Sequence, residues 1–275
     1  MKIHSFDGKN IHLFGGSSGI GLATAKQLAK LGANIFIYAR TEQRLKSAAL
    51  EIKKHCQISE QHVVWISVDI SIPEDVQKTI ASTVEKHGAP DILINCAGRA
   101  YPEHFEAISY EQFEETMKVN LFGIWNSIQS ILPYMKENGG LIVNTSSVVG
   151  YVGIFGYTDY AASKFGIIGL SEALRSELKR YGIGVSILCP PDTETPGFET
   201  ENLTKPAETK AISQGAGMMG ADQVAEQLIK GMRSGKKMII PGLDGKITHY
   251  IKRWFPGLFE FIIDRMVLKA QRQMS

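Results

Sequence analysis

Short runs of apolar residues alternate along the chain with longer stretches whose apolar positions recur at helical spacing. The short runs have the length and the branched aliphatic composition of buried strands. We predict strands at Ile11–Phe14, Asn34–Tyr38, Val63–Val68, Ile92–Asn95, Leu141–Thr145 and Val185–Leu188. We predict helices between them at Ile20–Lys30, Glu42–His55, Pro73–His87, Tyr110–Met135 and Tyr160–Tyr181. This alternation indicates an α/β fold, with a doubly wound parallel sheet and helices on both of its faces.

The chain has no linker that would divide it into two folding units, and we expect a single domain over residues 1–245. Residues 192–220 are rich in Thr, Glu, Pro and Gly, and they separate the last predicted strand from a helix near Ala221–Met232. A segment of this length inside a compact domain is usually a lid or a binding loop. We therefore expect residues 192–220 to cover a binding site.

Residues 246–275 form a C-terminal extension with an amphipathic pattern. Its apolar residues recur at roughly helical spacing, at Tyr250, Ile251, Trp254, Phe255, Leu258, Phe259, Ile262, Ile263 and Met266. Basic residues flank them at Lys246, Lys252, Arg253, Arg265 and Lys269. Pro256 and Gly257 predict a break into two helices. Residues 246–269 could lie in a membrane interface, cover the binding site or pack on a second subunit, and an ordinary core or dimer helix is the plain alternative.

Composition narrows the class of protein. The chain has 275 residues, 44% of them hydrophobic, and a formal net charge of +2, which gives no reason to expect a nucleic-acid partner. Cys56, Cys96 and Cys189 are few and scattered, as in a cytosolic protein with reduced thiols, and the seven histidines show no metal-ligand spacing, so we expect no metal site. The N-terminus lacks a signal-peptide pattern, and no apolar run reaches the roughly 18 residues of a membrane span. We expect a cytoplasmic location, with peripheral contact to a membrane surface as the alternative for the extension.

The first predicted strand runs directly into a glycine-rich turn that opens a helix. Glycines allow a tight turn and a close approach of the backbone to a pyrophosphate, and the N-terminus of the helix offers free N–H groups and a positive dipole end. Because the turn lies between a strand and a helix, it favours a Rossmann-type nucleotide site over a plain turn. The candidate contacts are Gly15, Ser17, Ser18, Gly19, Ile20 and Gly21.

The end of the second strand bears on the choice of cofactor. An acidic residue there would accept hydrogen bonds from the adenosine ribose of NAD, but this chain has Ala39 followed by Arg40. A guanidinium can hold the 2′-phosphate of NADP, so we predict NADPH, against the alternative that Arg40 is simply exposed to solvent. Asp69 and Ile70 follow the third strand, where Asp69 could accept from the adenine amino group or cap the next helix.

A third pattern supplies acid–base chemistry. Tyr160 and Lys164 are four residues apart on a predicted helix, so the phenol and the ammonium can share one site. A neighbouring cation favours the phenolate, and we expect Lys164 to lower the pKa of Tyr160 and so make it a usable proton donor. The plain alternative for this pair is a solvated helix face. Ser146 and Ser147 follow the fifth strand, where either hydroxyl could instead bond to backbone.

These motifs, in this order and spacing, resemble the short-chain dehydrogenase/reductase family across the chain to about residue 240. The resemblance implies hydride transfer between a nicotinamide and a carbonyl or alcohol. It makes Tyr160 the general acid in reduction, and it makes Lys164 the residue that tunes Tyr160 and holds the nicotinamide ribose. It assigns Ser147, rather than Ser146, to the substrate carbonyl oxygen, and it assigns Asn120 to a water that links Lys164 to solvent. It also implies cofactor contacts at Asn95, Ala97, Gly98, Pro190, Thr193 and Thr195.

The chain departs from the usual family pattern at two positions. Phe14 stands where the family usually has the Thr whose hydroxyl braces the turn after Asn95, and Cys96 replaces the second Asn of that turn. The run Pro190-Pro191-Asp192-Thr193 is similar to the subfamily that uses NADPH to reduce the 3-keto group of 3-ketodihydrosphingosine, a long-chain lipid ketone of sphingolipid synthesis. Family members usually pair through the helices at Tyr110–Met135 and Tyr160–Tyr181, so the resemblance implies a homodimer or homotetramer.

Other functions remain to be weighed against a sphingoid ketone reductase. Within the same class, the substrate could be another lipid-like carbonyl, such as a steroid, a retinoid-like compound or a 3-oxoacyl group. A nucleotide-binding regulator with a relic site is a different class, and the intact Ser147, Tyr160 and Lys164 argue against it. A scaffold that acts at membrane surfaces through residues 246–275 is a third class.

Overall fold

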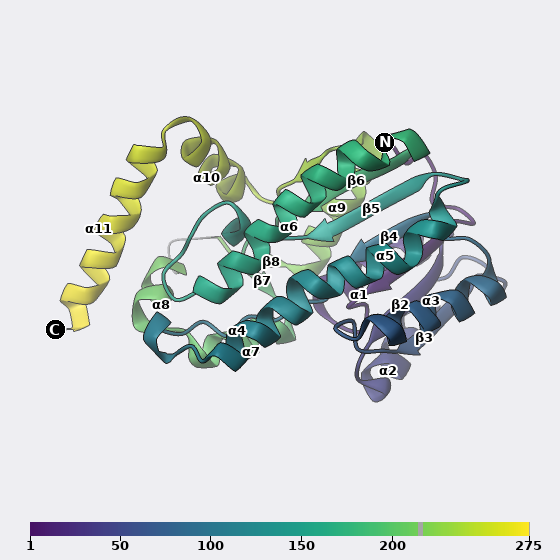
Figure 1. The fold of residues 1–275 in the computed structure, drawn as a ribbon, viewed down its shortest axis with the longest axis horizontal. Coiled ribbons are helices and arrows are strands. Elements are labelled where there is room, and N and C mark those ends of the chain that lie inside the picture. The colour runs from purple at the N-terminus through teal and green to yellow at the C-terminus, as the bar shows by residue number, and fades with distance from the viewer. Residues whose placement is uncertain (214–216, 275) are drawn as a thin grey trace.

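The computed structural model describes residues 1–213 and 217–274, which form an α/β domain followed by two C-terminal helices (Figure 1). Within these residues, seven parallel strands form one sheet in the order β3-β2-β1-β4-β5-β6-β9. The strands are β1 (Asn10–Phe14), β2 (Asn34–Ala39), β3 (Val63–Ser67), β4 (Ile92–Asn95), β5 (Gly140–Thr145), β6 (Ile183–Leu188) and β9 (Met238–Ile239). The predicted parallel sheet and its first six strands are confirmed. β9 was not predicted, because its ladder with β6 is only two residue pairs long.

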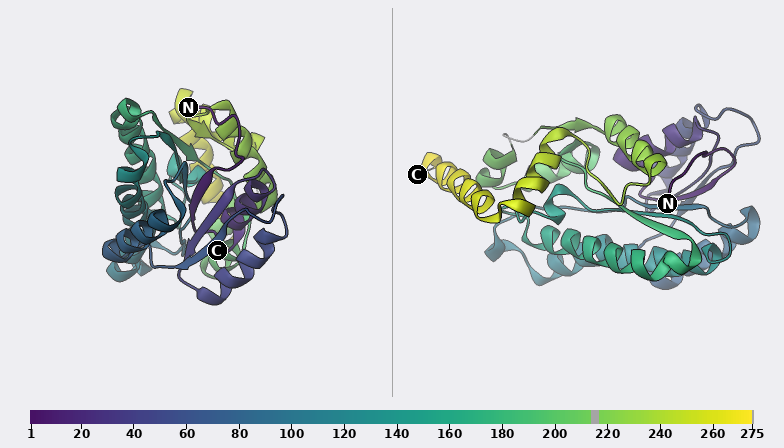
Figure 2. Two further views of the ribbon diagram at one scale, coloured as in Figure 1. Left: turned by 90° about the vertical axis from the view of Figure 1, so that its right-hand side faces the viewer. Right: turned by 90° about the horizontal axis from the view of Figure 1, so that it is seen from above.

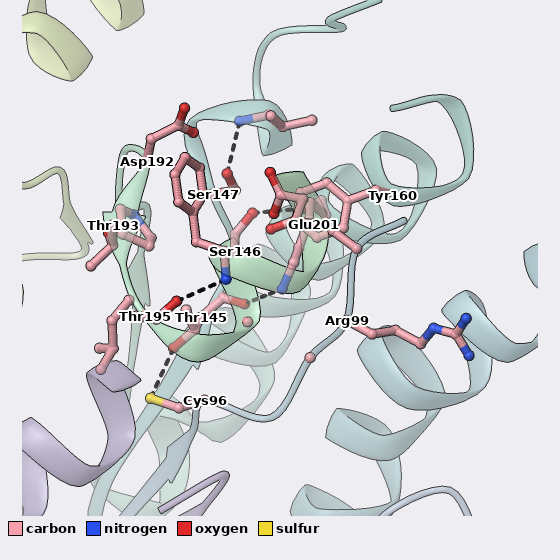
Figure 3. Close-up of a pocket in the computed structure, with 18 of the residues that line it drawn as sticks. Cys96, Arg99, Thr145, Ser146, Ser147, Tyr160, Asp192, Thr193, Thr195 and Glu201 are labelled. Carbon is pink, nitrogen blue, oxygen red and sulfur yellow. Dashed lines mark hydrogen bonds between the residues drawn. The ribbon is translucent and has the colours of Figure 1, made fainter. Parts of the chain in front are cut away.

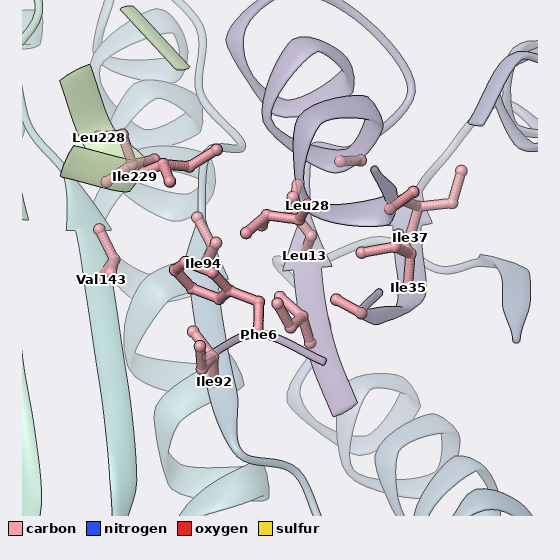
Figure 4. Packing of buried hydrophobic residues seen from close by; sticks show 14 of the residues in the cluster. Phe6, Leu13, Leu28, Ile35, Ile37, Ile92, Ile94, Val143, Leu228 and Ile229 are labelled. Atoms are coloured by element: carbon pink, nitrogen blue, oxygen red, sulfur yellow. The ribbon is translucent and has the colours of Figure 1, made fainter. Parts of the chain in front are cut away.

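Helices cover both faces of the sheet, as predicted (Figure 2). They are α1 (Gly19–Ala29), α2 (Glu42–Lys53), α3 (Pro73–His87), α4 (Tyr110–Met117), α5 (Gly123–Met135), α6 (Thr158–Glu177) and α9 (Ala221–Ser234). The apolar faces of α1, α2 and α9 pack on one side of the sheet, and those of α3, α5 and α6 pack on the other. Figure 4 shows the first of these cores, where Leu28 of α1 and Leu228 of α9 meet Leu13 and Ile94 of the central strands.

The strand order reverses direction between β1 and β4, and this reversal positions the binding cleft. β1 is followed in sequence by β2 on one side, whereas its other neighbour is β4, with Phe14 paired to Asn95. The turns that leave these two strands therefore start side by side and diverge. In open parallel sheets a crevice forms at such a switch point, outside the carboxyl ends of the strands.

One predicted helix contains a distortion. The stretch predicted as Tyr110–Met135 consists of α4 and α5 joined by a π-helical turn at Lys118–Phe122, with Asn120 buried at its centre. Wide turns of this kind leave backbone groups outside the regular α-helical ladder and often occur at functional sites. The turn lies at the residue that the family resemblance assigned to a catalytic water.

The predicted lid is folded into short elements. It contains β7 (Thr193–Glu194), α7 (Pro196–Thr204), α8 (Ala207–Ser213) and β8 (Met219–Gly220). β7 and β8 pair in parallel, through Thr193 with Met219 and Glu194 with Gly220, which ties the two ends of the segment together. Residues 214–216 of the predicted lid lie outside the described residues.

The C-terminal extension forms α10 (Leu243–Trp254) and α11 (Pro256–Met274), so the predicted break at Pro256 is confirmed. α11 extends away from the body of the domain and packs on α10 and α8 (Figure 2). Phe259 and Ala270 are buried on it, whereas Leu258, Phe261 and Leu268 are exposed. α11 is therefore not a helix of the domain core. No helix in the described residues is both long enough and apolar enough to span a bilayer, and residue 275 of the extension lies outside them.

Candidate active site

Two adjoining cavities form one cleft along the carboxyl ends of the strands. We call them the glycine-turn half, with a volume of about 300 Å³, and the tyrosine half, of about 320 Å³. Ile20, Arg40, Cys96, Gly98 and Thr195 line both halves, which makes the cleft continuous. Figure 3 shows the residues that line the tyrosine half.

The glycine turn fits a pyrophosphate group sterically and electrostatically. Gly15 has φ +83°, and a Cβ on it would lie 2.5 Å from the backbone nitrogen of Ala97. A Cβ on Gly21 would lie 2.2 Å from the carbonyl oxygen of Gly15, so both positions require glycine. The N-cap Ser18 makes no side-chain capping bond, and the first turn of α1 carries no acidic residue. The N–H groups at this helix end are thus open toward the cleft, as a phosphate requires.

The predicted contacts of this half line it with one exception. Ser17, Ser18, Gly19, Ile20, Gly21, Arg40, Asp69, Ile70, Ala97 and Gly98 all line the cleft. Asn95 lies beneath it, because its buried side chain donates from Nδ2 to Oδ1 of Asn144 at 2.9 Å and accepts from Ser127 Oγ at 2.8 Å. The side-chain amide of Asn95 is therefore committed to Asn144 and Ser127, and the predicted cofactor contact at Asn95 stays a prediction. The buried amide fixes the strand end from which Ala97 and Gly98 follow.

The glycine-turn half of the cleft holds two guanidinium groups. The Arg40 side chain is 68% exposed and lies 4.0 Å from the Asp69 carboxylate. Arg44, in the first turn of α2, lines the same half, and sequence reasoning missed it although it follows Arg40 by four residues. Asp69 closes a local turn by accepting from the backbone nitrogen of Ser71 at 2.9 Å. It is not the N-cap of α3, which is Ile72, so the capping alternative for Asp69 is wrong.

The two departures from the family pattern have structural explanations. Phe14 stacks on Tyr38 with ring centroids 4.5 Å apart, so the aromatic ring fills a buried place between strands β1 and β2. The backbone nitrogen of Cys96 donates to the carbonyl of Phe14 at 2.8 Å, and the Cys96 sulfur lies 3.3 Å from Oγ1 of Thr145. The turn after β4 is therefore held by this backbone bond and by a contact to β5, without the missing threonine hydroxyl.

The structure favours Ser147 over Ser146 as the substrate-facing hydroxyl. The Ser146 hydroxyl donates to the backbone carbonyl of Lys164 at 2.8 Å and is fully buried, so it holds β5 against α6. Ser147 Oγ accepts from the backbone nitrogen of Val149 at 3.1 Å, which leaves its proton free to point into the cleft. Ser147 and Tyr160 line the same cavity, and a hydrogen bond between their hydroxyls opposes the burial that raises the pKa of Tyr160.

Lys164 stands beneath Tyr160, as predicted from their spacing. Its Nζ lies 5.3 Å from the centroid of the Tyr160 ring and donates to the carbonyl of Thr145 at 3.1 Å. The side chain is buried, and this burial lowers the pKa of Lys164 to about 8. An ammonium with a lowered pKa can exchange protons near neutral pH, which suits a residue that must return a proton to a catalytic tyrosine.

The predicted direction of the pKa shift of Tyr160 is wrong for this structure. Burial raises the pKa of Tyr160 first, and the negative charges of Glu201 and Asp192 raise it further, against the opposing hydrogen bond from Ser147. The spacing of Tyr160 and Lys164 could reveal the cation, but it could not reveal two carboxylates that come from a distant segment.

Asn120 is next to Lys164 but does not offer its side chain to a water. Its Oδ1 accepts from the backbone nitrogen of Arg99 at 2.8 Å, and its Nδ2 donates to Arg99 O and to Ser163 Oγ, each at 3.0 Å. A Cβ on Gly98 would lie 3.4 Å from Asn120 Oδ1 and 3.5 Å from Lys164 Nζ, so the three residues meet at one point. The role of Asn120 in holding a water stays a prediction.

Residues of the predicted lid complete the tyrosine half. Pro190, Thr193 and Thr195 line it as predicted. Thr195 caps α7 by accepting from the backbone nitrogen of Phe198 at 3.1 Å. A Cβ on Gly19 would lie 2.9 Å from the Thr195 methyl carbon, so the lid reaches across to the glycine turn.

A group of charged residues that the sequence did not single out also lies in the lid. The Lys205 Nζ is 3.0 Å from Glu201 Oε1 and 3.9 Å from Asp192 Oδ2, and the Lys205 side chain is only 1% exposed. The Tyr157 hydroxyl donates a hydrogen bond to Glu201 Oε1. Lys205 Nζ also lies over the Phe198 ring, 4.0 Å from its centroid. We call Asp192, Glu201 and Lys205 the lid charge cluster. The sequence feature that could have indicated this cluster is the presence of two acidic residues, Asp192 and Glu201, in the predicted lid.

Comparison with known proteins identifies the class. The sequence profile of the short chain dehydrogenase family matches residues 9–206, and the chain belongs to this family. The fold agrees with a short chain dehydrogenase/reductase from Burkholderia phymatum solved in complex with NAD, with a TM-score of 0.79 at 23% identity over 91% of this chain and 96% of that one. The predicted membership in the short-chain dehydrogenase/reductase family is confirmed.

Within this class, the chain is similar to proteins named 3-ketodihydrosphingosine reductase. It is 41% identical over 240 residues to the 3-ketodihydrosphingosine reductase of Bos taurus, covering 86% of this chain and 72% of that protein. It is 39% identical over 269 residues to the 3-ketodihydrosphingosine reductase of Dictyostelium discoideum, covering 92% of this chain and 80% of that protein. The resemblance that the Pro-Pro-Asp run indicated is thereby confirmed across most of the chain.

The lowered pKa of Lys164 predicts how stability depends on pH. Between about pH 8 and 10.5 the unfolded chain holds its Lys164 proton more firmly than the folded chain does, so the free energy of unfolding should rise with pH through this window. Relative to Lys164→Met, the wild type should gain roughly 2 kcal/mol between about pH 7 and pH 10. Urea unfolding of both proteins at each pH measures this gain, since other titrating groups are common to both. A constant difference would contradict the assigned shift.

Proposed function

We propose that the protein reduces 3-ketodihydrosphingosine to dihydrosphingosine with NADPH as the hydride source. The observation that carries this proposal is the convergence of Ser147, Tyr160 and Lys164 in one cavity that continues into the glycine turn. The substrate follows from similarity to proteins named for this reaction over most of the chain. The reaction converts a ketone to a secondary alcohol, which takes up one hydride at carbon and one proton at oxygen.

The residues of the tyrosine half supply the proton and stabilise the developing charge. When it is bound, the nicotinamide supplies the hydride that adds to the carbonyl carbon. Ser147 donates a hydrogen bond to the carbonyl oxygen, where negative charge develops. Tyr160 transfers its phenol proton to the same oxygen, which completes the alcohol. Lys164 lies beneath Tyr160 and stabilises the phenolate that is left, until a proton returns.

The residues of the glycine-turn half support NADPH as the preferred cofactor. The backbone N–H groups at the start of α1 would hold the pyrophosphate, and Thr195 lies where the lid meets that turn. Ala39 takes the place of an acid that would select NAD, and Arg40 and Arg44 line the same end of the cleft. Two guanidinium groups match the doubly charged 2′-phosphate of NADP, whereas NAD offers them only a hydroxyl.

We propose further that the protein works in the cytoplasm, at a membrane surface reached by its C-terminal extension. Trp254 is 68% exposed, Leu258 is 53% exposed and Phe261 is 57% exposed. Lys246, Arg265 and Lys269 lie on the same two helices, and a basic amphipathic surface of this kind suits an anionic lipid interface. A lipid-soluble substrate would be available at that surface.

We also propose that the protein is a homodimer or homotetramer that pairs through α4, α5 and α6. Trp125 is 54% exposed and Phe165 is 45% exposed on α5 and α6, and Tyr110 and Phe113 are exposed on α4. Aromatic side chains are enriched in the buried centres of protein interfaces.

Tyr160→Phe should abolish turnover and leave cofactor binding nearly unchanged, because it removes only the transferable proton. The measurement is NADPH oxidation at 340 nm, with 3-ketodihydrosphingosine in detergent micelles, beside NADPH titration of both proteins. The rate should fall by at least about a hundredfold, the low end of what a general acid contributes. Preserved turnover would show that Tyr160 is not the acid. A wild type that binds NADPH but leaves the sphingoid ketone unreduced would refute the substrate, and a panel of steroid, retinoid-like and 3-oxoacyl carbonyls would follow.

Arg40→Ala and Arg44→Ala should each raise the Kd of NADPH by roughly ten- to a hundredfold and change the Kd of NADH little. The reason is that each variant removes one charge-assisted bond, worth about 1.5–3 kcal/mol, to a phosphate that NADH lacks. Titration by fluorescence gives both constants. Lys54→Ala, at the C-terminal end of α2, is the control variant: it also removes one positive charge, and it should alter neither Kd. Equal weakening of both cofactors would show that the arginines do not bind the 2′-phosphate.

The double variant Leu258→Glu, Phe261→Glu should lose vesicle binding, because it places two charges on the apolar face of α11. Flotation with vesicles of phosphatidylcholine and phosphatidylserine measures the bound fraction, which should fall by at least about fivefold. The double variant Leu50→Glu, Ile58→Glu carries the same changes at exposed apolar residues outside the extension and should float like the wild type. Equal flotation of all three proteins would refute membrane contact through α11.

A further inference from the structure

The proposed substrate carries a charge close to the reacting carbon, and this inference rests on the proposed function. In 3-ketodihydrosphingosine an amino group is attached to the carbon next to the ketone, and it is an ammonium when protonated. Because so few bonds separate the two groups, an ammonium whose ketone oxygen meets Ser147 and Tyr160 must lie in the same tyrosine half of the cleft. The residues that recognise it must therefore be among those that line this cavity.

The tyrosine half contains acidic residues that neither hydride transfer nor proton transfer requires. Among the described residues that line it, Asp192 and Glu201 are the acidic ones (Figure 3). Asp192 directly follows Pro190 and Pro191 at the end of β6, and Glu201 lies on α7, so two separate parts of the lid bring carboxylates to one cavity. Both carboxylates act on Tyr160 through their charge, which puts them within electrostatic reach of the reacting oxygen.

The lid charge cluster is unbalanced by one negative charge. Lys205 is the cation that pairs with both carboxylates, at 3.0 Å from Glu201 and 3.9 Å from Asp192. Burial raises the pKa of Glu201 and the pKa of Asp192, which means that both carboxylates are costly to keep ionised here. One further cation facing the cavity would balance the cluster formally and reduce that cost.

The acidic pair also opposes the chemistry of the site when Lys205 is its only cationic partner. The two negative charges raise the pKa of Tyr160, so they disfavour the phenolate that remains after proton transfer. A positive group between the carboxylates and Tyr160 would cancel this effect at the moment when the proton leaves. The arrangement thus suits a substrate that brings its own positive charge into the site.

We propose that Glu201, together with Asp192, binds the ammonium group of the amino-ketone substrate and so selects substrates that carry a charged amine next to the ketone. Lys205 and Tyr157 hold the Glu201 carboxylate in place, and both contact its Oε1 atom. Glu201 and Asp192 are binding residues in this assignment, whereas Tyr160 and Ser147 remain the residues that act on the ketone oxygen.

The test compares two forms of one ketone, 3-ketodihydrosphingosine with its free amine and the same molecule N-acetylated, which is uncharged. The wild type should prefer the free amine in kcat/KM, and Glu201→Gln and Asp192→Asn should each reduce that preference by about tenfold or more, chiefly through KM for the amine. The ratio of the two substrates is the readout, because a merely structural defect lowers both alike. Glu199→Gln removes an exposed carboxylate from the same helix and should leave the preference intact.

Each outcome bears on the proposal separately from the proposed function. Unchanged preference in properly folded Glu201→Gln and Asp192→Asn, judged by Tm and by the Kd of NADPH, would overturn the ammonium site while the reductase activity stands. If the wild type reduces neither ketone, the proposed function fails, and binding of dodecylamine against dodecanol by calorimetry then tests the site. Tighter binding of the amine that is lost in Glu201→Gln would support the acidic site, and equal binding of amine and alcohol would overturn it.

Discussion

The close approach of two backbone turns at the switch point of the sheet is the constraint on which the rest of the site depends. β1 and β4 are neighbours with Phe14 opposite Asn95, so the glycine turn and the turn after β4 start at the same level. Only a residue without a side chain fits at Gly15, because a Cβ would lie 2.5 Å from the nitrogen of Ala97. This contact sets the floor of the cleft, and the open N-terminus of α1 and the tyrosine half are positioned relative to it.

Buried polar hydrogen bonds hold the sheet and α6 in one register. Asn95 and Asn144 join β4 to β5, Asn144 continues to Ser171 of α6 at 3.0 Å, and Ser146 reaches the backbone of Lys164. Such groups are costly when unpaired in a core, so the bonded arrangement is strongly favoured over shifted ones. The consequence is that Ser147, at the end of β5, and Tyr160, on α6, face each other across a rigid connection rather than a flexible one.

The lid places negative charge near Tyr160, which opposes the positive charge of Lys164. Lys164 lies beneath Tyr160, while Asp192 and Glu201 approach from the lid and oppose formation of the phenolate. A tyrosine between a cation and two carboxylates is sensitive to whatever charge enters the cavity. α8 of the same lid also packs on α11, so the segment that shapes the cavity is in contact with the exposed C-terminal extension.

Much of this protein is determined by local sequence. The alternation of apolar runs and helical stretches predicted six strands and their helices, because a strand buried on both faces must be continuously apolar. The glycine turn and the pair Tyr160 and Lys164 were equally visible, because their spacing in the chain fixes their spacing in space. The same holds for the break at Pro256, since proline cannot continue a helix.

Only the tertiary structure decided which side chains meet across long separations. Asn95 had the position of a cofactor contact, but its amide is committed to Ser127 and Asn144, which the sequence places 32 and 49 residues away. A lowered pKa of Tyr160 was predicted from Lys164, its neighbour on the helix. The pKa is instead raised by burial and by Glu201, which lies 41 residues further along the chain. Spacing determines contacts within one element, but burial and the field of distant charges exist only once the elements have packed together.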